Sequence, residues 1–344
     1  MGIVNGCIDI LTQMPSYPHM AYNNTYGLQI INQSEYTAAV NSFPQCKTQV
    51  ESCQSLAKSK DPSAKGNVEE VNKACREAFK FCFDAMHKPA AEKGINPFDI
   101  TAKYVGSFPP KYAAGFLNTR EAQLDLGVPL NFSGYSVAVN ESFTMAGDFV
   151  LGRNLAVLGE LLDRGVKVAL VYGDADYQCN WYGGEQISLA IESKLSKAFR
   201  KAGYAEIRST NTNPNNRSDI LGGYVRQHGG FSFSRVLDAG HEAPWYQPQV
   251  THDIFNRVIF NRDVPTGKKP LGAGINTGYS TTGLSSVVGI TNKVPAHPVS
   301  ECYVWDIFQT CTPAQAQMLR NGVAITKDFI MTGYYASDGA AIYY

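Results

Sequence analysis

Two segments of this 344-residue chain each run from an apolar strand pattern into a loop that carries an ionisable side chain. β-branched and aromatic residues predict a strand over 166–172, and Asp176 follows it in the loop Gly-Asp-Ala-Asp. A second strand pattern over 230–236 leads to His241 in Gly-His-Glu-Ala-Pro. Because a helical pattern over 185–202 lies between them, we expect an α/β sheet with parallel strands. Functional sites in such sheets lie beyond the carboxyl ends of the strands, where both Asp176 and His241 are expected.

Asp176 and His241 have the chemistry and the chain order of two members of a Ser…Asp…His hydrolytic triad. In such a triad the carboxylate holds the imidazole in one tautomer and stabilises its charged form, while the imidazole moves the proton. Gly240 and Pro244 flank His241 and predict a rigid turn that presents the ring. The nearby Asp174 is interpreted instead as a residue that caps backbone donors in its turn.

The acidic loop also allows a calcium interpretation, which two features oppose. Asp174, Asp176, Gln178 and Glu185 occupy positions 1, 3, 5 and 12 of an EF-hand spacing. Position 6 of that motif is a glycine that permits a sharp turn, but here it is Cys179. A strand also precedes the loop where the motif requires a helix. We therefore expect no metal and no other cofactor.

The composition argues against two classes of partner. Lys+Arg and Asp+Glu both total 30, so no net field attracts nucleic acid or an anionic membrane surface. Apolar residues make up 44% of the chain and charged residues 17%, which is typical of an ordered globular protein. No apolar run approaches the roughly 18 residues that a membrane-spanning helix requires. We therefore expect neither nucleic acid nor a membrane as a partner.

Eight cysteines favour an oxidising compartment, and four of them have an informative spacing. Cys46 and Cys53 are seven residues apart, as are Cys75 and Cys82, and both pairs lie in helical patterns. Seven residues make about two helical turns, so each pair shares one face. An antiparallel helical hairpin would join Cys46 to Cys82 and Cys53 to Cys75, although four cysteines allow three connectivities.

The other four cysteines fall into two groups. Cys302 and Cys311 are near enough in sequence to close a small loop with a disulfide. Cys7 and Cys179 are left over, and we expect both to be buried free thiols, because unpaired cysteine is among the most buried residue types.

Five N-x-Ser/Thr sequons favour a glycosylated secretory protein. They begin at Asn23, Asn32, Asn131, Asn140 and Asn216. The N-terminus shows no signal-peptide pattern: no lysine or arginine precedes Lys47, and the chain opens with a strand pattern that turns at Asn5-Gly6. A chain that opens inside a core strand is expected to be part of a longer one.

These patterns predict four segments. Residues 1–10 form a core strand and its exit loop, and residues 11–115 form a mostly helical cap insertion that contains the four spaced cysteines. Residues 116–262 form the C-terminal half of the α/β domain. Residues 263–344 begin rich in Gly, Ser, Thr and Pro, and we expect a linker followed by a C-terminal tail.

The two polar loops also carry a family resemblance. Gly-Asp-Ala-Asp-Tyr-Gln-Cys-Asn-Trp at 173–181 and Gly-His-Glu-Ala-Pro-Trp-Tyr-Gln-Pro at 240–248 resemble the acid and histidine motifs of the serine carboxypeptidase family. The opening Gly-Ile-Val-Asn-Gly-Cys-Ile-Asp resembles the strand after the nucleophile helix in that family. The resemblance spans residues 1–262 and is fungal in type. It implies the C-terminal half of an α/β-hydrolase fold with a helical cap, in a secreted or vacuolar enzyme that removes single residues from peptide or protein C-termini without a cofactor.

The resemblance assigns roles to residues one by one. Asp176 would be the triad acid and His241 the general base. Cys179 would match a family thiol close to the site, and Asn180 would shape the loop that binds substrate. Glu242 would face the leaving residue of the peptide, where a carboxylate would favour a basic side chain by charge pairing.

The family nucleophile does not occur in these 344 residues. Family members carry it in Gly-Glu-Ser-Tyr-Gly/Ala-Gly, on a sharp strand-to-helix turn. The segments around Ser136, Ser234 and Ser285 all fail the G-x-S-x-G pattern. We therefore expect the chain alone to be inactive and its sheet to expose an apolar edge. An acyltransferase on the same scaffold, an unrelated α/β-hydrolase such as a lipase, and a non-catalytic binding protein are the alternatives.

Overall fold

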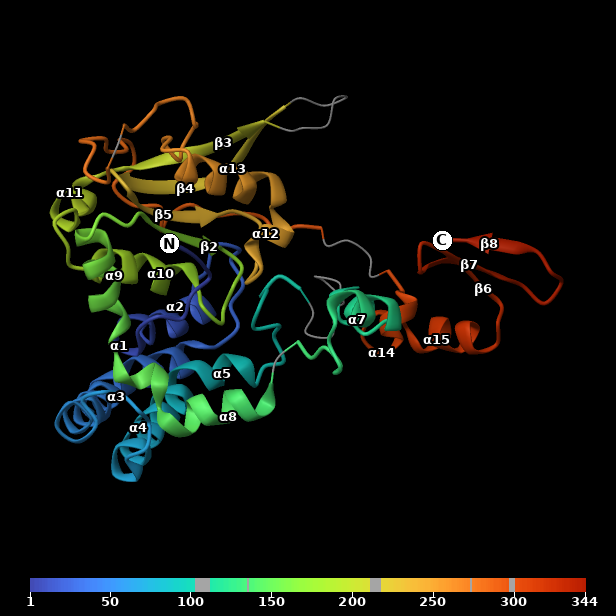
Figure 1. Ribbon diagram of the computed structural model, residues 1–344, viewed down its shortest axis with the longest axis horizontal. Helices are drawn as coiled ribbons and strands as arrows, with labels where there is room; N and C mark the ends of the chain where they lie inside the picture. Colours follow the sequence, from blue (N-terminus) through green and yellow to red (C-terminus); the bar gives the residue numbers. More distant parts are fainter. Residues whose placement is uncertain (103–111, 135, 211–217, 273, 297–300) are drawn as a thin grey trace. The chain divides into compact units, whose positions relative to one another are not determined.

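The computed structural model describes residues 1–344 except 103–111, 135, 211–217, 273 and 297–300 (Figure 1). The chain divides into two compact units, one formed by residues 1–104 and 141–295 and the other by residues 105–140 and 296–344. These units differ from the predicted segments. Residues 263–295 belong to the unit that contains the α/β sheet, and residues 105–140 group with the C-terminal tail.

A five-stranded sheet organises the larger unit, with helices packed beside it (Figure 1). Its strand order is β1 (Gly2–Val4), β2 (Val168–Gly173), β5 (Phe231–Val236), β4 (Asp219–His228) and β3 (Tyr204–Thr210). β1, β2 and β5 are parallel, whereas β4 is antiparallel to both of its neighbours. The parallel strands with intervening helices confirm the predicted α/β architecture.

The centre of the sheet is covered on both faces. Every residue of β2 and β5 is buried, as expected for central strands of this kind. α9 (Asn154–Asp163), α10 (Trp181–Ala190) and α11 (Ser196–Lys201) supply apolar side chains to the core beside them. α10 and α11 replace the single helix predicted over 185–202, because Ile191 is extended and the Ser196 hydroxyl donates to the Ile191 carbonyl oxygen.

β1 lies at the edge of the sheet and is exposed. Among the described strands it pairs only with β2, and Met1 and Val4 are 57% and 44% exposed. An apolar groove of about 570 Å³ lies beside it, between β1 and α13 (Pro248–Ile259), and is lined by residues that include Ile3, Ile254 and Phe255. The apolar sheet edge expected from the sequence is therefore present.

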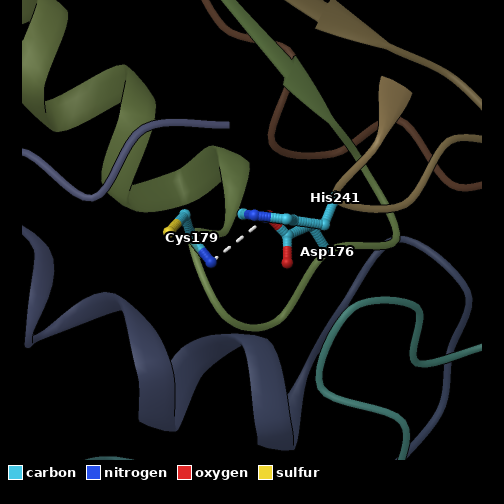
Figure 2. Close-up of side chains that lie close together, drawn as sticks. All are labelled: Asp176, Cys179 and His241. Carbon is cyan, nitrogen blue, oxygen red and sulfur yellow. Dashed lines mark hydrogen bonds and ion pairs between the residues drawn. The ribbon is translucent and has the colours of Figure 1, made fainter. Parts of the chain in front are cut away.

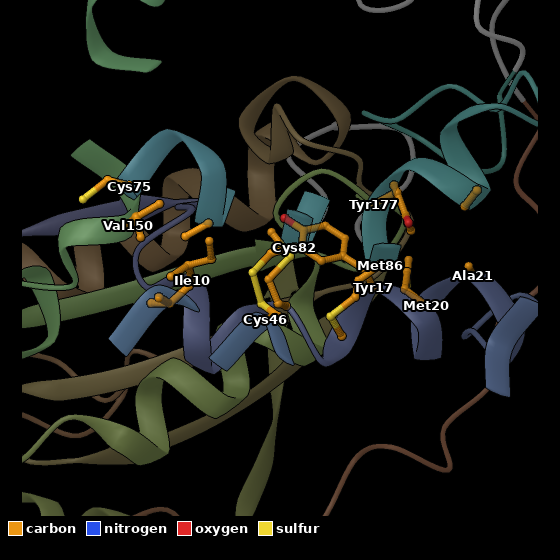
Figure 3. Packing of buried hydrophobic residues seen from close by; sticks show 14 of the residues in the cluster. Ile10, Tyr17, Met20, Ala21, Cys46, Cys75, Cys82, Met86, Val150 and Tyr177 are labelled. Atoms are coloured by element: carbon orange, nitrogen blue, oxygen red, sulfur yellow. A yellow bond between two sulfur atoms is a disulfide. The ribbon is translucent and has the colours of Figure 1, made fainter. Parts of the chain in front are cut away.

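A disulfide-bonded helical hairpin lies within the predicted cap insertion. Its helices are α3 (Gln33–Lys60) and α4 (Glu69–Cys82). The two disulfides that join them are Cys46–Cys82 and Cys53–Cys75, which is the connectivity favoured by the seven-residue spacing. All four cysteines belong to a buried cluster with Ile10, Tyr17 and Val150. Figure 3 shows Cys46, Cys75 and Cys82 within it. The hairpin is thus held together both by covalent bonds and by an apolar core.

Residues 263–295, which the sequence predicted to be part of a linker, pack against the sheet instead. Val264 and Val287 are fully buried. Arg235 on β5 donates hydrogen bonds to the carbonyl oxygens of Val287 and Ile290, at 2.5 and 3.0 Å. The Gly- and Ser-rich composition suggested a linker, but hydrogen bonds to a buried cation and buried valines hold the segment in place.

The smaller unit combines short helices with a three-stranded antiparallel sheet. The sheet has the order β6 (Ala324–Lys327), β7 (Ile330–Tyr335) and β8 (Ala341–Tyr343). The helices are α6 (Tyr112–Leu117), α7 (Arg120–Leu126), η3 (Val304–Asp306), α14 (Ile307–Thr310) and α15 (Pro313–Arg320). The expected disulfide between Cys302 and Cys311 closes the loop around η3 and α14.

The remaining helices are mostly short. They are α1 (Ile10–Gln13), α2 (Ser16–Tyr22), η1 (Phe83–His87), α5 (Lys88–Ala91), α8 (Val137–Ala146), η2 (Asp148–Leu151) and α12 (Ala243–Tyr246). Across the described ranges, none of the helices combines the length and the apolar character needed to span a bilayer.

Candidate active site

The site lies where the neighbouring parallel strands β2 and β5 end, at one edge of the sheet. β2 continues into the loop that carries Asp176, and β5 continues into the loop that carries His241. The two loops approach closely: a Cβ on Gly173 would lie 2.3 Å from the carbonyl oxygen of Gly240, so a larger residue does not fit there. The fold therefore brings together the two residues that the sequence predicted to be partners.

Asp176 and His241 are joined by a hydrogen bond of 2.9 Å between Oδ2 and Nδ1; Figure 2 shows the two side chains together at the loop that follows β2. The Asp176 side chain is fully buried, whereas 32% of the His241 side chain is exposed. The same Oδ2 accepts hydrogen bonds from Asn5 Nδ2 at 2.7 Å and from the Cys179 backbone N–H at 3.2 Å. Three donors thus hold the carboxylate in one orientation toward the ring.

Asn5 is a site residue that the sequence analysis missed. It follows β1 with a φ of 44°, a left-handed conformation in which asparagine is enriched. Its Oδ1 accepts a hydrogen bond from the Gly173 backbone N–H at 3.1 Å while its Nδ2 donates to Asp176. The available signal was the Asn-Gly pair directly after a strand, which we interpreted only as a turn.

Burial and pairing act together on the two ionisable groups. Burial raises the pKa of the Asp176 carboxyl, and the hydrogen bonds from His241, Asn5 and the Cys179 amide oppose that rise only in part. Burial alone would lower the pKa of His241, but the hydrogen bond and charge of Asp176, with a contribution from Glu242, raise it above its usual value. The protonated imidazole is therefore stabilised, which suits a general base.

The hydrogen bond to Asp176 also determines what the imidazole can do. Because Nδ1 donates to the carboxylate, Nε2 of a neutral His241 is an acceptor. An open cleft of about 630 Å³ lies beside the ring and is lined by Val4, Glu242, Pro244, Trp245 and His241 itself. Within the part of the chain that the structure describes, no hydroxyl is hydrogen-bonded to this ring. The arrangement can accept a proton from a nucleophile that enters the cleft.

Cys179 is not a free thiol, so the expectation for Cys7 and Cys179 was wrong. The two form a disulfide with 5.2 Å between their Cα atoms, which ties the acid loop to the segment after β1. Cys179 is 5% exposed and supports the site instead of facing substrate. Asp176, Cys179 and His241 offer ligand-type atoms within 4.8 Å of one another (Figure 2), but a disulfide sulfur is not the thiolate that binds metals.

Asn180 also supports the site through the start of α10. It is 1% exposed, and its Oδ1 accepts a hydrogen bond from the Gly183 backbone N–H at 3.0 Å, as the N-cap of α10. Its Nδ2 donates to the carbonyl oxygen of Tyr177. Asn180 therefore shapes the loop from a buried position, whereas Glu242 is exposed and lines the cleft.

Asp174 makes a buried ion pair beyond the turn contacts expected of it. Its Oδ1 accepts a hydrogen bond from the Tyr26 hydroxyl at 2.5 Å, and its Oδ2 lies 3.5 Å from Arg235 Nη2. Both charged side chains are fully buried, and the guanidinium of Arg235 also lies 4.0 Å from the centre of the Trp181 ring. The carboxylate of Asp174 thus neutralises a buried cation, which argues further against the calcium interpretation.

The helical insertion holds the acid loop from another side. Tyr17 donates a hydrogen bond to the Gln178 carbonyl oxygen at 2.6 Å, and His87 Nε2 lies 3.1 Å from Gln178 Oε1. Burial lowers the pKa of His87 to about 4, so its ring is neutral at pH 7 and Nε2 carries the proton that it donates. The acid loop is therefore anchored on both sides, by the insertion and by the disulfide to Cys7.

Comparison with known proteins identifies the family to which this arrangement belongs. Residues 1–261 match the family model described as serine carboxypeptidase. The chain belongs to the serine carboxypeptidase family. Carboxypeptidase S1 homolog A of Arthroderma otae is 39% identical to it over 96% of this chain and 50% of that protein. Carboxypeptidase S1 homolog A of Arthroderma benhamiae is 40% identical, over 98% of this chain and 52% of that protein.

This member of the serine carboxypeptidase family spans about half the length of the curated relatives that it matches. Among solved structures it is similar to Kex1(delta)p, a prohormone-processing carboxypeptidase from Saccharomyces cerevisiae, with a TM-score of 0.50 and 19% identity. That likeness covers 75% of this chain and 53% of the other, and it shows an α/β-hydrolase-type fold. The family resemblance inferred from the two loop motifs is thereby confirmed.

Proposed function

We propose that this chain supplies the acid and the base of a serine-type carboxypeptidase, which releases single residues from the C-termini of peptides or proteins. One observation carries the proposal: a 2.9 Å hydrogen bond joins a fully buried carboxylate to a partly exposed imidazole beside an open cleft. Asp176 orients His241, and His241 takes the proton of a nucleophilic serine and returns it to the leaving amine. The serine comes from outside these 344 residues.

The exposed edge of β1 is where a strand that leads to the serine would pair. Val4 lines both the apolar groove beside β1 and the cleft beside His241. A parallel strand added along β1 would therefore end next to His241, and its apolar side chains would fill the groove against α13. A serine on the turn after that strand would lie within reach of Nε2. The added strand would also satisfy the unpaired backbone groups that an edge strand presents.

Reconstitution tests this function. The chain is co-expressed with the part of Carboxypeptidase S1 homolog A from Arthroderma benhamiae that has no counterpart in it. We expect the chain alone to resist labelling by a serine-directed fluorophosphonate and to release no C-terminal residues. The assembled pair should be labelled and should release C-terminal residues. The matched control is the same partner segment with its nucleophilic serine replaced by alanine. A pair that assembles without labelling or hydrolysis would contradict the catalytic proposal and favour a non-catalytic binding protein.

An acyltransferase on this scaffold would use the same acid and base. It would pass the acyl group from the serine to an alcohol instead of water. Product analysis of the assembled pair with an added alcohol separates the two activities, because a carboxypeptidase yields mainly the free acid and an acyltransferase mainly the ester.

Glu242 is proposed to favour basic leaving residues. Its exposed carboxylate lines the cleft next to His241 and can pair with a C-terminal Lys or Arg of the peptide. In the assembled enzyme, Glu242→Gln should lower kcat/KM for such substrates by roughly 1.5-fold to fivefold, the range of a solvent-exposed ion pair, and leave C-terminal Leu unchanged. Glu206→Gln, at an exposed carboxylate on β3, is the control. Equal turnover of Lys, Arg and Leu substrates by the unmodified enzyme would remove this role.

We also propose that the protein passes through the secretory pathway. Its four disulfides are typical of proteins made in an oxidising compartment. Four sequon asparagines are exposed, namely Asn23, Asn32, Asn131 and Asn140, whereas Asn216 lies outside the described residues. Asn32 caps α3 through Oδ1 and not through the Nδ2 that would carry a glycan. A gel-mobility shift after glycosidase treatment of the protein made in a fungal host measures this, and an unchanged mobility would contradict it.

A further inference from the structure

A second cavity lies away from the catalytic cleft, between α11 with the two residues that follow it, Arg226 on β4 and the segment 280–285. Its volume is about 570 Å³. It is lined by three cationic residues and four residues with hydroxyl groups: Arg200, Lys201, Arg226, Ser280, Thr281, Thr282 and Ser285. No carboxylate occurs among the lining residues that the structure describes. The cavity therefore combines positive charge with hydrogen-bonding hydroxyls.

Arg226 is the most deeply placed cation of this cavity. It lies on β4, is only 6% exposed, and its guanidinium carbon is 4.6 Å from the centre of the Tyr204 ring. Its Nη2 donates a hydrogen bond to the Ser285 carbonyl oxygen at 3.0 Å, but its Nε is buried without a partner among the described residues. A guanidinium offers five N–H donors, so this one is incompletely satisfied where an unpaired charge is costly.

The neighbouring charges do not neutralise this cation directly. Glu192 is engaged by Arg200, which donates to both of its carboxylate oxygens at 2.9 Å. The buried Glu185 accepts a hydrogen bond from the Tyr204 hydroxyl and does not line the cavity. Lys201 is exposed and forms no ion pair within the described ranges. The carbonyl groups at the C-terminal end of α11 repel an anion only weakly, because the helix is only six residues long and its dipole is therefore small.

We propose that this cavity binds a phosphate or sulfate group, either free or carried on a larger molecule. The anion would supply the acceptors that Arg226 lacks, and Lys201 would add a second charge-assisted hydrogen bond. Hydroxyls of Thr282 and Ser285 would donate to the remaining oxygens. The site shares no lining residue with the catalytic cleft, so it is independent of peptide hydrolysis.

Thermal unfolding of the 344-residue chain tests the site. Inorganic phosphate should raise Tm more than sodium chloride at equal ionic strength, because a ligand that binds only the native state stabilises it by mass action. Lys201→Glu changes an exposed residue and should weaken the apparent Kd for phosphate at least about tenfold, the loss of one charge-assisted contact. Lys197→Glu lies on the same helix but outside the cavity, and it should respond to phosphate as the unmodified chain does.

A second variant tests the role of Arg226 without replacing it. Ser285→Asp would place a carboxylate beside the guanidinium, so it should raise Tm without phosphate and abolish the phosphate response. A larger gain with glycerol 3-phosphate than with inorganic phosphate would show that the group is carried on a larger molecule, and an equal gain would show that the free ion suffices. No gain over chloride, or an equal gain in Lys201→Glu and the unmodified chain, would overturn the proposal.

Discussion

Asp176→Asn should reduce kcat/KM of the assembled enzyme by roughly 10⁴-fold, the order seen when the acid of a serine–histidine–aspartate triad becomes an amide. The amide no longer holds His241 in the tautomer that leaves Nε2 as an acceptor, and it lacks the charge that stabilises the imidazolium. In the chain alone, the same substitution should lower the pKa of His241, because burial then acts without the opposing hydrogen bond and charge of Asp176. A peptidase assay and an NMR titration of the ring measure the two effects.

Asp174→Asn is the matched control for this experiment. Asp174 lies in the same loop, is equally buried, and pairs with Arg235 instead of His241. Its replacement should change stability but leave the pKa of His241 close to that of the unmodified chain. If the pKa of His241 fell equally in both variants, or failed to fall in Asp176→Asn, the hydrogen bond to Asp176 would not be what controls this imidazole.

Removal of the disulfide between Cys7 and Cys179 should have the largest effect on stability. The bond joins residues 172 positions apart, for which the loop-entropy relation gives roughly 5 kcal/mol at 25 °C. Two other disulfides lie within that loop and shorten it, so we expect Cys7→Ala/Cys179→Ala to lose about 3–5 kcal/mol in the free energy of unfolding. Urea denaturation measures the loss. The pKa of His241 should shift as well, because the Cys179 amide donates to Asp176.

Cys302→Ala/Cys311→Ala provides the comparison. These residues are 9 positions apart, so the same relation gives only about 2.5 kcal/mol, and they lie in the smaller unit. This variant should leave the pKa of His241 unchanged. Unfolding of the Cys7→Ala/Cys179→Ala chain at the same urea concentration as the unmodified chain would show that the longer bond contributes little.

The predictions that held rest on regularities of secondary structure. Asp176 and His241 could be paired because parallel strands present their carboxyl ends at one edge of a sheet, and each residue follows a recognisable strand pattern. The hairpin disulfides could be paired because a seven-residue spacing returns to the same helix face. In both cases a short local pattern specified the direction of the side chain.

The predictions that failed concern contacts between distant segments. Cys7 and Cys179 were expected to be buried free thiols, since no local spacing points to their pairing across 172 positions. Asn5 was missed because its partner is 171 positions away. Residues 263–295 were expected to be a linker because their composition gives no sign of the buried Arg235 that binds their carbonyl oxygens.

The sequence by itself determined the family, the α/β architecture, the acid–histidine pair and the absence of a G-x-S-x-G motif from these 344 residues, because each of these depends only on short local patterns of residues. The tertiary structure alone decided what holds the pair in place. Asn5, the disulfide from Cys7 and the Tyr17 hydroxyl reach the acid loop from segments far away in the chain. Long-range contacts of this kind depend on how the strands and helices pack, and local sequence patterns do not encode that packing.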